Sequence, residues 1–165
     1  MSRTKAREIA LHLIFEMGFQ QFEDENLDDR LDESIMASIS GDIALYAGKL
    51  SEQQTRYIRS VVKGVAGHLD ELDRTIETYA KGWKLSRLSR MTTAVLRLAI
   101  YEMRHVDDVP VSVAINEAVS LAKVYDTDEA ASFINGVLGA VARAEFPKAA
   151  PAAKKDEPEA EEGNA

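Results

Sequence analysis

The stretch that decides the fold is Leu88–His105, LSRMTTAVLRLAIYEMRH. On a helical wheel its apolar side chains fill about 200° of arc, and a face that wide needs neighbours on more than one side. These side chains are Leu88, Met91, Val95, Leu96, Leu98, Ala99, Ile100 and Met103. The pattern therefore predicts the central helix of an all-α domain.

One acidic residue, Glu102, falls on that apolar arc. Burying an isolated carboxylate costs on the order of several kcal/mol, so a side chain at this position needs a partner. We interpret Glu102 as a core carboxylate with its hydrogen bonds satisfied and not as a catalytic group.

Apolar residues recur at helical spacing on both sides of this stretch. The expected helices are Ser2–Gln21, Ser51–Leu69, Asp70–Tyr79, Val111–Tyr125 and Thr127–Glu145, with a weaker one at Ser34–Ala47. Ser51 and Asp70 are the expected N-caps, and Asp126 with Glu129 resembles a capping box. No segment alternates as a strand does, so the expected fold class is all-α.

The net charge of −8 is unevenly distributed over the 165 residues. Phe22–Glu33 carries seven acids and one base, and the tail Pro147–Ala165 carries five acids and three lysines, so the rest of the chain is neutral. The tail is rich in Ala, Pro, Lys and Glu, which predicts disorder. The acidity is therefore confined to a loop and a tail, and local basic patches fit elsewhere.

Several kinds of chemistry have no motif in this sequence. There is no cysteine, no glycine-rich phosphate loop and no stretch of 18 apolar residues, which predicts a cytoplasmic protein without a membrane span. His12, His68 and His105 stand far apart, so neither a metal nor another cofactor is expected. With no catalytic set, the sequence favours a binding protein over an enzyme.

Two basic segments bear on what is bound. Arg3, Lys5 and Arg7 precede the first acid and form an arm able to attract phosphate over a Debye length of about 8–10 Å. An ordinary solvated chain end is the alternative. The second run, Lys81–Arg90, is interpreted as a solvated linker and helix start, with Trp83 plugging the interface between the helical halves.

Aromatic residues mark two further surfaces. Leu11 and Phe15 form a second apolar face on the first helix, to be covered either by the following loop or by another protein. Phe133, near Glu129 on the wheel, either packs in the core or stacks on an unpaired base at about 1–3 kcal/mol. Gly136 and Gly139 cost about 1 kcal/mol each in a helix, which suggests close approach of another backbone, within the fold or from a partner.

Four segments together resemble the NusB family of bacterial transcription antitermination factors. They are KAREIALHLIF (5–15), AVLRLAIYEM (94–103), DVPVSVAINEAVSLAK (108–123) and SFINGVL (132–138). The resemblance covers most of residues 3–143 and is weakest over residues 20–50. It implies two three-helix bundles packed together, at about 3–80 and about 84–146, within a helical RNA-binding domain of residues 1–146.

The resemblance also implies a function. Proteins of this family bind the boxA element of nascent ribosomal RNA leaders, as unpaired RNA, together with NusE, which is also a protein of the small ribosomal subunit. The pair helps the transcription elongation complex to pass terminators.

The implied site residues follow from the matching segments. Arg3, Lys5 and Arg7 match the RNA-binding arm, and Glu129 and Phe133 match the RNA-facing end of the last helix. Phe15, with Leu11 on the same face, matches the side that meets NusE. Thr92 stands where many relatives carry an acid that contacts NusE, which predicts a weaker contact here.

Two other readings of the sequence stay open at this stage. The chain resembles the front domain of some RNA cytosine methyltransferases, so it fits a remnant or accessory RNA-binding domain of such an enzyme, although it has no cysteine nucleophile. A homodimer that joins through the small residues Gly136 and Gly139 would hide the RNA-facing surface.

Overall fold

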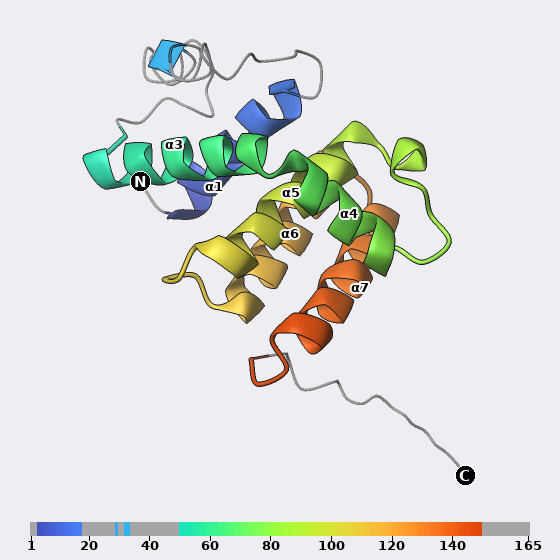
Figure 1. Cartoon of the computed structure of the whole chain (residues 1–165). Coiled ribbons are helices and arrows are strands. Elements are labelled where there is room, and N and C mark those ends of the chain that lie inside the picture. The colour runs from blue at the N-terminus through green and yellow to red at the C-terminus, as the bar shows by residue number, and fades with distance from the viewer. Residues whose placement is uncertain (1–2, 18–28, 30–31, 34–49, 150–165) are drawn as a thin grey trace.

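The computed structural model describes residues 3–17, 29, 32–33 and 50–149, and these form an all-helical body (Figure 1). The helices are α1 (Arg3–Met17), α3 (Glu52–Gly67), α4 (Leu69–Tyr79), the short 3-10 helix η2 (Leu85–Arg87), α5 (Arg90–His105), α6 (Val111–Tyr125) and α7 (Asp128–Glu145). No strand occurs in this part of the chain, so the all-α prediction is confirmed. The expected helix at 34–47 and the tail beyond residue 149 lie outside the described residues.

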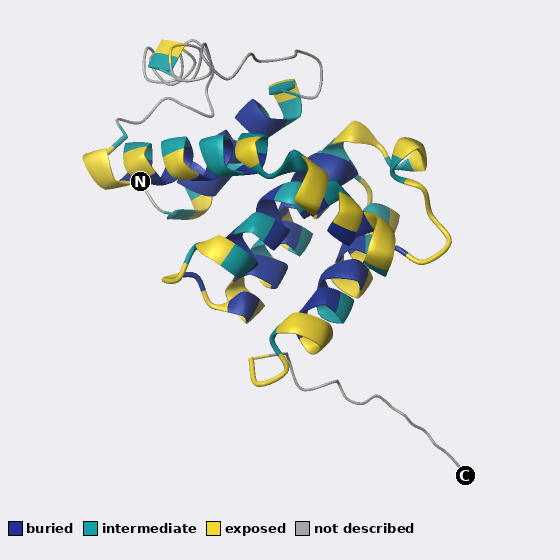
Figure 2. Cartoon of the chain, in the orientation of Figure 1, coloured by how far each residue is buried: buried dark blue, intermediate teal, exposed yellow. Residues whose placement is uncertain are grey.

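Helix α5 is the centre of the molecule, as its wide apolar arc predicts. It contacts α1, α3, α4, α6 and α7, and the side chains of Leu96, Leu98 and Ile100 are fully buried. Helix α4 belongs to the first half of the chain by sequence, yet it packs mainly on α5 and also on α7. Figure 2 shows buried residues along these helices, with exposed residues on their outer turns and in the connectors.

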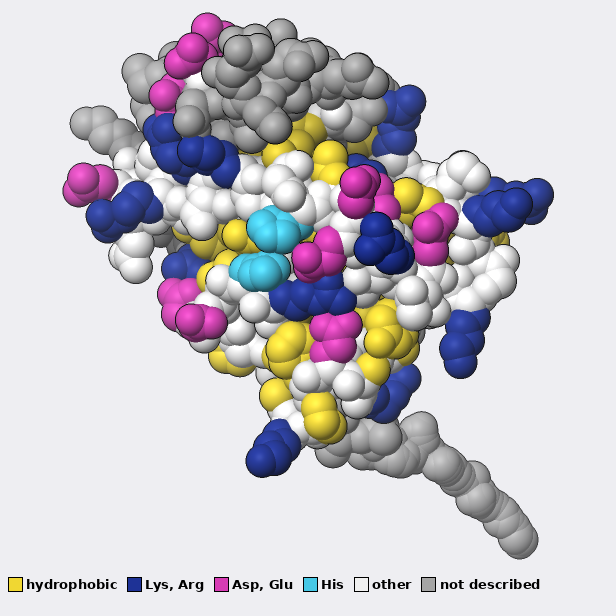
Figure 3. Space-filling view, in the orientation of Figure 1, with side chains coloured by type: hydrophobic (Ala, Val, Ile, Leu, Met, Phe, Trp, Pro, Cys, Tyr) yellow, Lys and Arg dark blue, Asp and Glu magenta, His cyan; other side chains and the backbone are white. Residues whose placement is uncertain are grey.

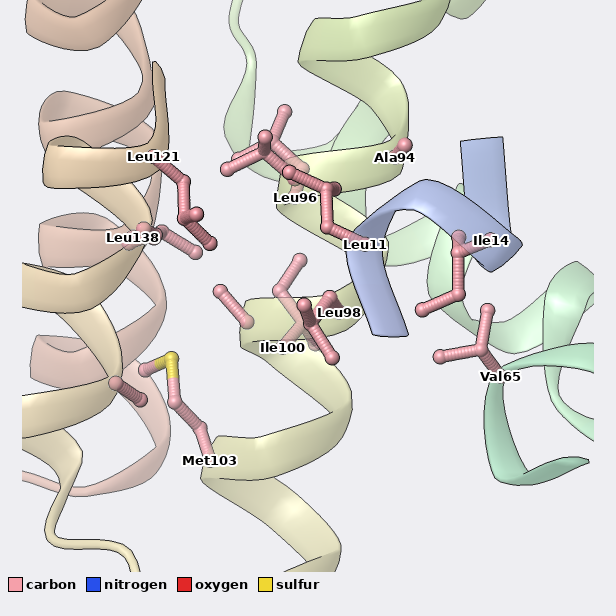
Figure 4. Close-up of a cluster of buried hydrophobic side chains, with 14 of the residues drawn as sticks. Leu11, Ile14, Val65, Ala94, Leu96, Leu98, Ile100, Met103, Leu121 and Leu138 are labelled. Atoms are coloured by element: carbon pink, nitrogen blue, oxygen red, sulfur yellow. The ribbon is translucent and has the colours of Figure 1, made fainter. Parts of the chain in front are cut away.

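Helix α1 joins this core through one continuous apolar face. Leu11 points toward Leu96 and Leu98 of α5, and Ile14 points toward Val65 of α3 (Figure 4). Leu11 has no exposed surface. The expectation that Leu11 belongs to a second face, open to a partner, is therefore wrong, because α5 covers it within the same chain.

The helix ends agree with the sequence only in part. Ser51 caps α3 with a complete capping box, in which its hydroxyl accepts from the Gln54 amide and the Gln54 side chain accepts from the Ser51 amide. Asp70 is not a cap, since α4 already starts at Leu69. Thr127 caps α7 in place of Asp126, because its hydroxyl accepts from the Ala130 amide.

The close backbone approach expected at two glycines of α7 does not occur within the described residues. A methyl group at Gly136 would meet nothing within 4 Å, and one at Gly139 would meet only the Arg143 side chain. No backbone of this chain approaches either glycine among the described residues. The close contact occurs instead at Gly64, where a methyl group would lie 2.0 Å from the Tyr101 ring. Helix α3 thus makes room for an aromatic ring of α5.

Among the described residues, no helix combines the length and the apolar character needed to cross a bilayer.

Candidate nucleic-acid and partner interface

Arg7 of α1 lies inside the protein, where two acids hold its guanidinium. Its Nε and Nη2 donate to the two carboxylate oxygens of Glu102 at 2.8 and 2.9 Å, and its Nη1 donates to Glu117 at 2.8 Å. The Tyr57 hydroxyl donates to Glu102 as well, at 2.8 Å. Arg7 is 2 % exposed and Glu102 1 %, so this is a core network that joins α1, α3, α5 and α6.

The electrostatics of this network are those of a permanent ion pair. Burial by itself lowers the pKa of Arg7, but the hydrogen bond to Glu102 and the surrounding negative charge outweigh burial and raise it. Burial, followed by the charge of Glu102, raises the pKa of Tyr57 well above its ordinary value. The arginine stays charged and the tyrosine stays a neutral donor, so Glu102 is the satisfied core carboxylate that the sequence predicts.

This placement corrects the expectation that Arg7 meets RNA phosphate. A guanidinium with three donors on two carboxylates, inside the core, would have to leave both acids unpaired in order to reach a ligand. Arg7 therefore positions α1 and is not a free cation of the arm.

The other cations of the arm are half-buried and carry ion pairs on the protein surface. Arg3 lies 3.2 Å from Asp108 and its guanidinium sits 4.4 Å from the centre of the Tyr57 ring. Lys5 lies 3.3 Å from Glu8. Exposed pairs of this kind contribute about 0–1 kcal/mol, so a phosphate can replace the acid at little cost. The ion pairs of Arg3 and Lys5 lie at the surface, whereas those of Arg7 lie in the core.

Glu129 and Phe133 lie in the first two turns of α7, on a different side of the molecule from the first turn of α1 (Figure 1). Glu129 is exposed, and Phe133 is half-buried with its inner side against the core. The Phe133 ring meets Trp83, with 5.8 Å between ring centres and 66° between ring planes. The structure therefore brings Phe133 to Trp83 and not to the arm.

Trp83 does not plug the interface between the helical halves, contrary to expectation. The side chain is 52 % exposed and lies in the connector between α4 and α5. Sequence reasoning missed it as a surface residue, although Lys81 and Lys84 on either side of it favour an exposed position.

Phe15 lines an open groove at the other end of α1. The groove has a volume of about 500 Å³ and also receives Lys84, Leu88, Arg90 and Arg97 from the connector and α5. Phe15 is half-buried and packs on the core. Glu77 lines the groove as well, and Arg97 is paired with Asp73 at 2.7 Å. The groove therefore offers apolar side chains beside charges of both signs, which suits a protein segment with apolar and polar side chains.

Thr92, expected to face a protein partner, is buried. Its hydroxyl donates to Asp126 at 2.6 Å and lies 2.9 Å from the hydroxyl of Ser89, the residue that caps α5. The contact ties the start of α5 to the end of α6. Thr92 therefore acts within the fold, because its one donor is already satisfied by Asp126.

Among the described residues there is no group of three His, Cys, Asp or Glu side chains that fits a metal ion. What stands out instead is a set of surfaces, namely an aromatic pair, a groove and a basic connector, on a helical body. The fold and these surfaces define a binding protein.

The comparisons with known proteins give the family. A model described as the NusB family matches residues 4–143, and the chain belongs to this family. It is 45 % identical over 157 residues to a transcription antitermination protein NusB of Acetivibrio thermocellus, covering 95 % of this chain and 99 % of that one. It is 39 % identical to the NusB of Symbiobacterium thermophilum, over 87 % and 90 % of the two chains. Members of this family are transcription antitermination factors and not enzymes.

Solved structures agree with the fold. NusB of T. maritima superposes with a TM-score of 0.74 at 30 % identity, covering 90 % of this chain and 95 % of that one. A solved complex of the antitermination factors NusB and NusE with double-stranded RNA contains a chain that matches with a TM-score of 0.69 at 22 % identity, over 86 % and 96 % of the two chains. At that identity the second likeness speaks for the fold alone.

Proposed function

We propose that this protein binds the boxA element of nascent ribosomal RNA leaders together with NusE, and that the pair joins the transcription elongation complex and lets it pass terminators. The observation that carries the proposal is membership of the NusB family over residues 4–143, with relatives named as antitermination proteins. The proposal takes its two ligand classes, NusE and RNA, from the solved complex of the antitermination factors NusB and NusE with double-stranded RNA, which contains a chain of the same fold.

The geometry suits two ligands at two surfaces. On one surface, the half-buried Phe133 ring offers a face for stacking to an unpaired base. Glu129, one turn before it, offers an exposed carboxylate able to accept a hydrogen bond from the amino group of a base. On the other surface, the groove at Phe15 offers NusE apolar side chains beside charges of both signs.

The arm is a minor contributor to RNA binding in this proposal. Only Arg3 and Lys5 are placed to exchange an acid for a phosphate, and both lie beside acids that lower the local positive potential. Such contacts add affinity without sequence information.

The test is a gel shift with a boxA RNA and with a scrambled RNA of the same length and composition, each with and without NusE. We expect boxA to shift, more strongly with NusE, and the scrambled RNA to shift less. Equal shifts for the two RNAs, or no shift with NusE present at modest salt, would overturn the proposal.

A further inference from the structure

The connector between α4 and α5 is a cationic segment on the surface of the protein. Between Glu77 and Glu102 the chain has five Lys or Arg residues and no acid. Four of them, Lys81, Lys84, Arg87 and Arg90, are exposed. Of these, Lys81, Lys84 and Arg87 form no ion pair among the described residues. Figure 3 shows Lys and Arg side chains projecting along the edge where this connector lies.

Backbone and side-chain contacts hold the connector in one conformation. The Trp83 amide donates to the Ala80 carbonyl at 2.9 Å, and Gly82 adopts a φ of 82°, a conformation that side chains other than glycine rarely accept. Leu85 and Leu88 are half-buried and pack on the core. With the connector anchored at these leucines, Trp83 and Lys84 are exposed on the surface of the protein.

Trp83 adds a flat aromatic surface to this cationic segment. Its contact with Phe133 is edge to face, and about half of the indole is exposed, so an indole surface stays open. Unpaired cations beside an open aromatic face are the combination that binds single-stranded nucleic acid, through phosphate contacts and base stacking.

We propose that the connector is a second RNA-binding element, in which an unpaired base stacks on Trp83 beside Phe133 and Lys81 and Lys84 neutralise the flanking phosphates. The proposal deepens the RNA-binding function proposed above and rests on it. RNA fits better than a protein partner here, because lysine is depleted at protein interfaces and this segment offers two lysines beside its aromatic ring. Lys84 also lines the groove at Phe15, so RNA on the connector would border a protein seated in that groove.

Trp83 is the only tryptophan in the chain, so its own fluorescence reports the stacking. The experiment titrates the full chain with a boxA RNA labelled at one end. Anisotropy of the label measures RNA binding, and tryptophan emission measures contact with Trp83. We expect saturable quenching of the emission with the same midpoint as the rise in anisotropy.

Variants separate stacking from charge. Trp83→Ala should weaken RNA binding about fivefold or more, the loss expected when one stacked base is released, while Trp83→Phe should keep most of the affinity. The double variant Lys81→Ala and Lys84→Ala should lower the slope of log K against log salt by about 1.4, the value for two phosphates of a single strand. The matched control, Arg56→Ala with Arg74→Ala, removes two exposed cations from α3 and α4 and should leave that slope unchanged.

The outcomes distinguish the two proposals. If the wild-type chain binds boxA but its emission does not change and Trp83→Ala binds as well as wild type, the connector proposal is overturned and the proposed function stands. If Trp83→Ala loses NusE in a pull-down but keeps its RNA affinity, the connector is a protein surface and the proposal is also overturned. If the wild-type chain gives no anisotropy change even with NusE present, the proposed function itself is overturned. Melting curves establish that each variant is folded.

Discussion

The first turn of α1 and the α4–α5 connector carry the same kinds of side chain in opposite environments. Arg3, Lys5 and Arg7 all face acids, and Arg7 is sealed in the core. Lys81 and Lys84 face solvent, with no acid in their own segment. A basic run in a sequence therefore gives the number of cations. The packing of neighbouring helices decides how many of those cations can contact a phosphate.

The largest expected effect is on stability and concerns Arg7, the buried cation of α1. Arg7→Ala removes one partner of the ion pair and leaves Glu102 and Glu117 without their cation, which should lower the free energy of unfolding by about 3–5 kcal/mol. Arg7→Lys should recover only part of this loss, because an ammonium cannot make the paired contacts of a guanidinium. Urea unfolding followed by circular dichroism measures both.

Lys5→Ala is the control for that variant, since it removes a surface cation of the same helix. It should change the free energy of unfolding by less than about 0.5 kcal/mol. A folded Arg7→Ala chain with wild-type stability and reduced RNA affinity would contradict the structural role and place Arg7 at the RNA.

The next effect concerns what α1 contributes apart from its cations. Phe15→Asp places a charge on the apolar floor of the groove and should weaken NusE binding by about 2 kcal/mol or more, as expected for a central aromatic residue of an interface. Pull-down and isothermal titration with NusE measure it. Phe15→Leu, which keeps the site apolar, is the matched control, and retained NusE binding by a folded Phe15→Asp chain would remove the groove from the interface.

A smaller effect compares the arm with the connector directly. Arg3→Ala combined with Lys5→Ala should lower the salt slope of RNA binding less than Lys81→Ala combined with Lys84→Ala, because each arm cation must first give up an acid. The measurement is anisotropy of labelled boxA RNA at four or more salt concentrations. If the arm pair proves to control the slope and the connector pair does not, the ranking of the two segments is reversed.

The smallest effect is a pH dependence within α1. Burial lowers the pKa of His12 below its ordinary value of 6.5, against the opposing charges of Glu8 and Glu16. Above pH 6.5 His12 is neutral in both the folded and the unfolded chain, so it does not lower the free energy of unfolding. As the pH falls below 6.5, the unfolded chain takes up the proton first, so the free energy of unfolding decreases.

The variant His12→Gln should lose less stability between about pH 7.5 and pH 5.5 than the wild-type chain. Urea unfolding at the two pH values measures the free energy of unfolding of both chains. Both chains contain the same carboxylates, so the contribution of these groups to the pH dependence cancels in the difference between variant and wild type. An identical pH dependence in the two chains would mean that His12 titrates alike when folded and unfolded.

Much of the fold was predictable because helical periodicity is local. The width of the apolar arc on Leu88–His105 predicted a central helix. The single acid on that arc, Glu102, predicted a buried partner for its carboxylate. The caps were less predictable. Thr127 and not Asp126 caps α7, because the Asp126 carboxylate accepts from Thr92 of another helix, a contact that no local pattern contains.

The candidate site residues were also only partly predictable from the sequence. The residue types of a binding surface, with cations near the start of the chain and aromatic rings at Phe15 and Phe133, are present in the sequence, and so is the resemblance to the NusB family. The chain did not reveal which cations are neutralised, since Arg7 and Glu102 are 95 positions apart and meet only when α1 crosses α5. Nor did it reveal that Trp83 faces outward beside Phe133.

By itself, then, the amino-acid order determined the helices and the central place of α5, because those depend on spacing within one segment. The family followed from the resemblance of four segments. Only the tertiary structure decided which charges and rings are open to a ligand. Accessibility and charge neutralisation depend on side chains that distant parts of the chain bring together, and Coulomb energy acts on distance in space and not on distance along the chain.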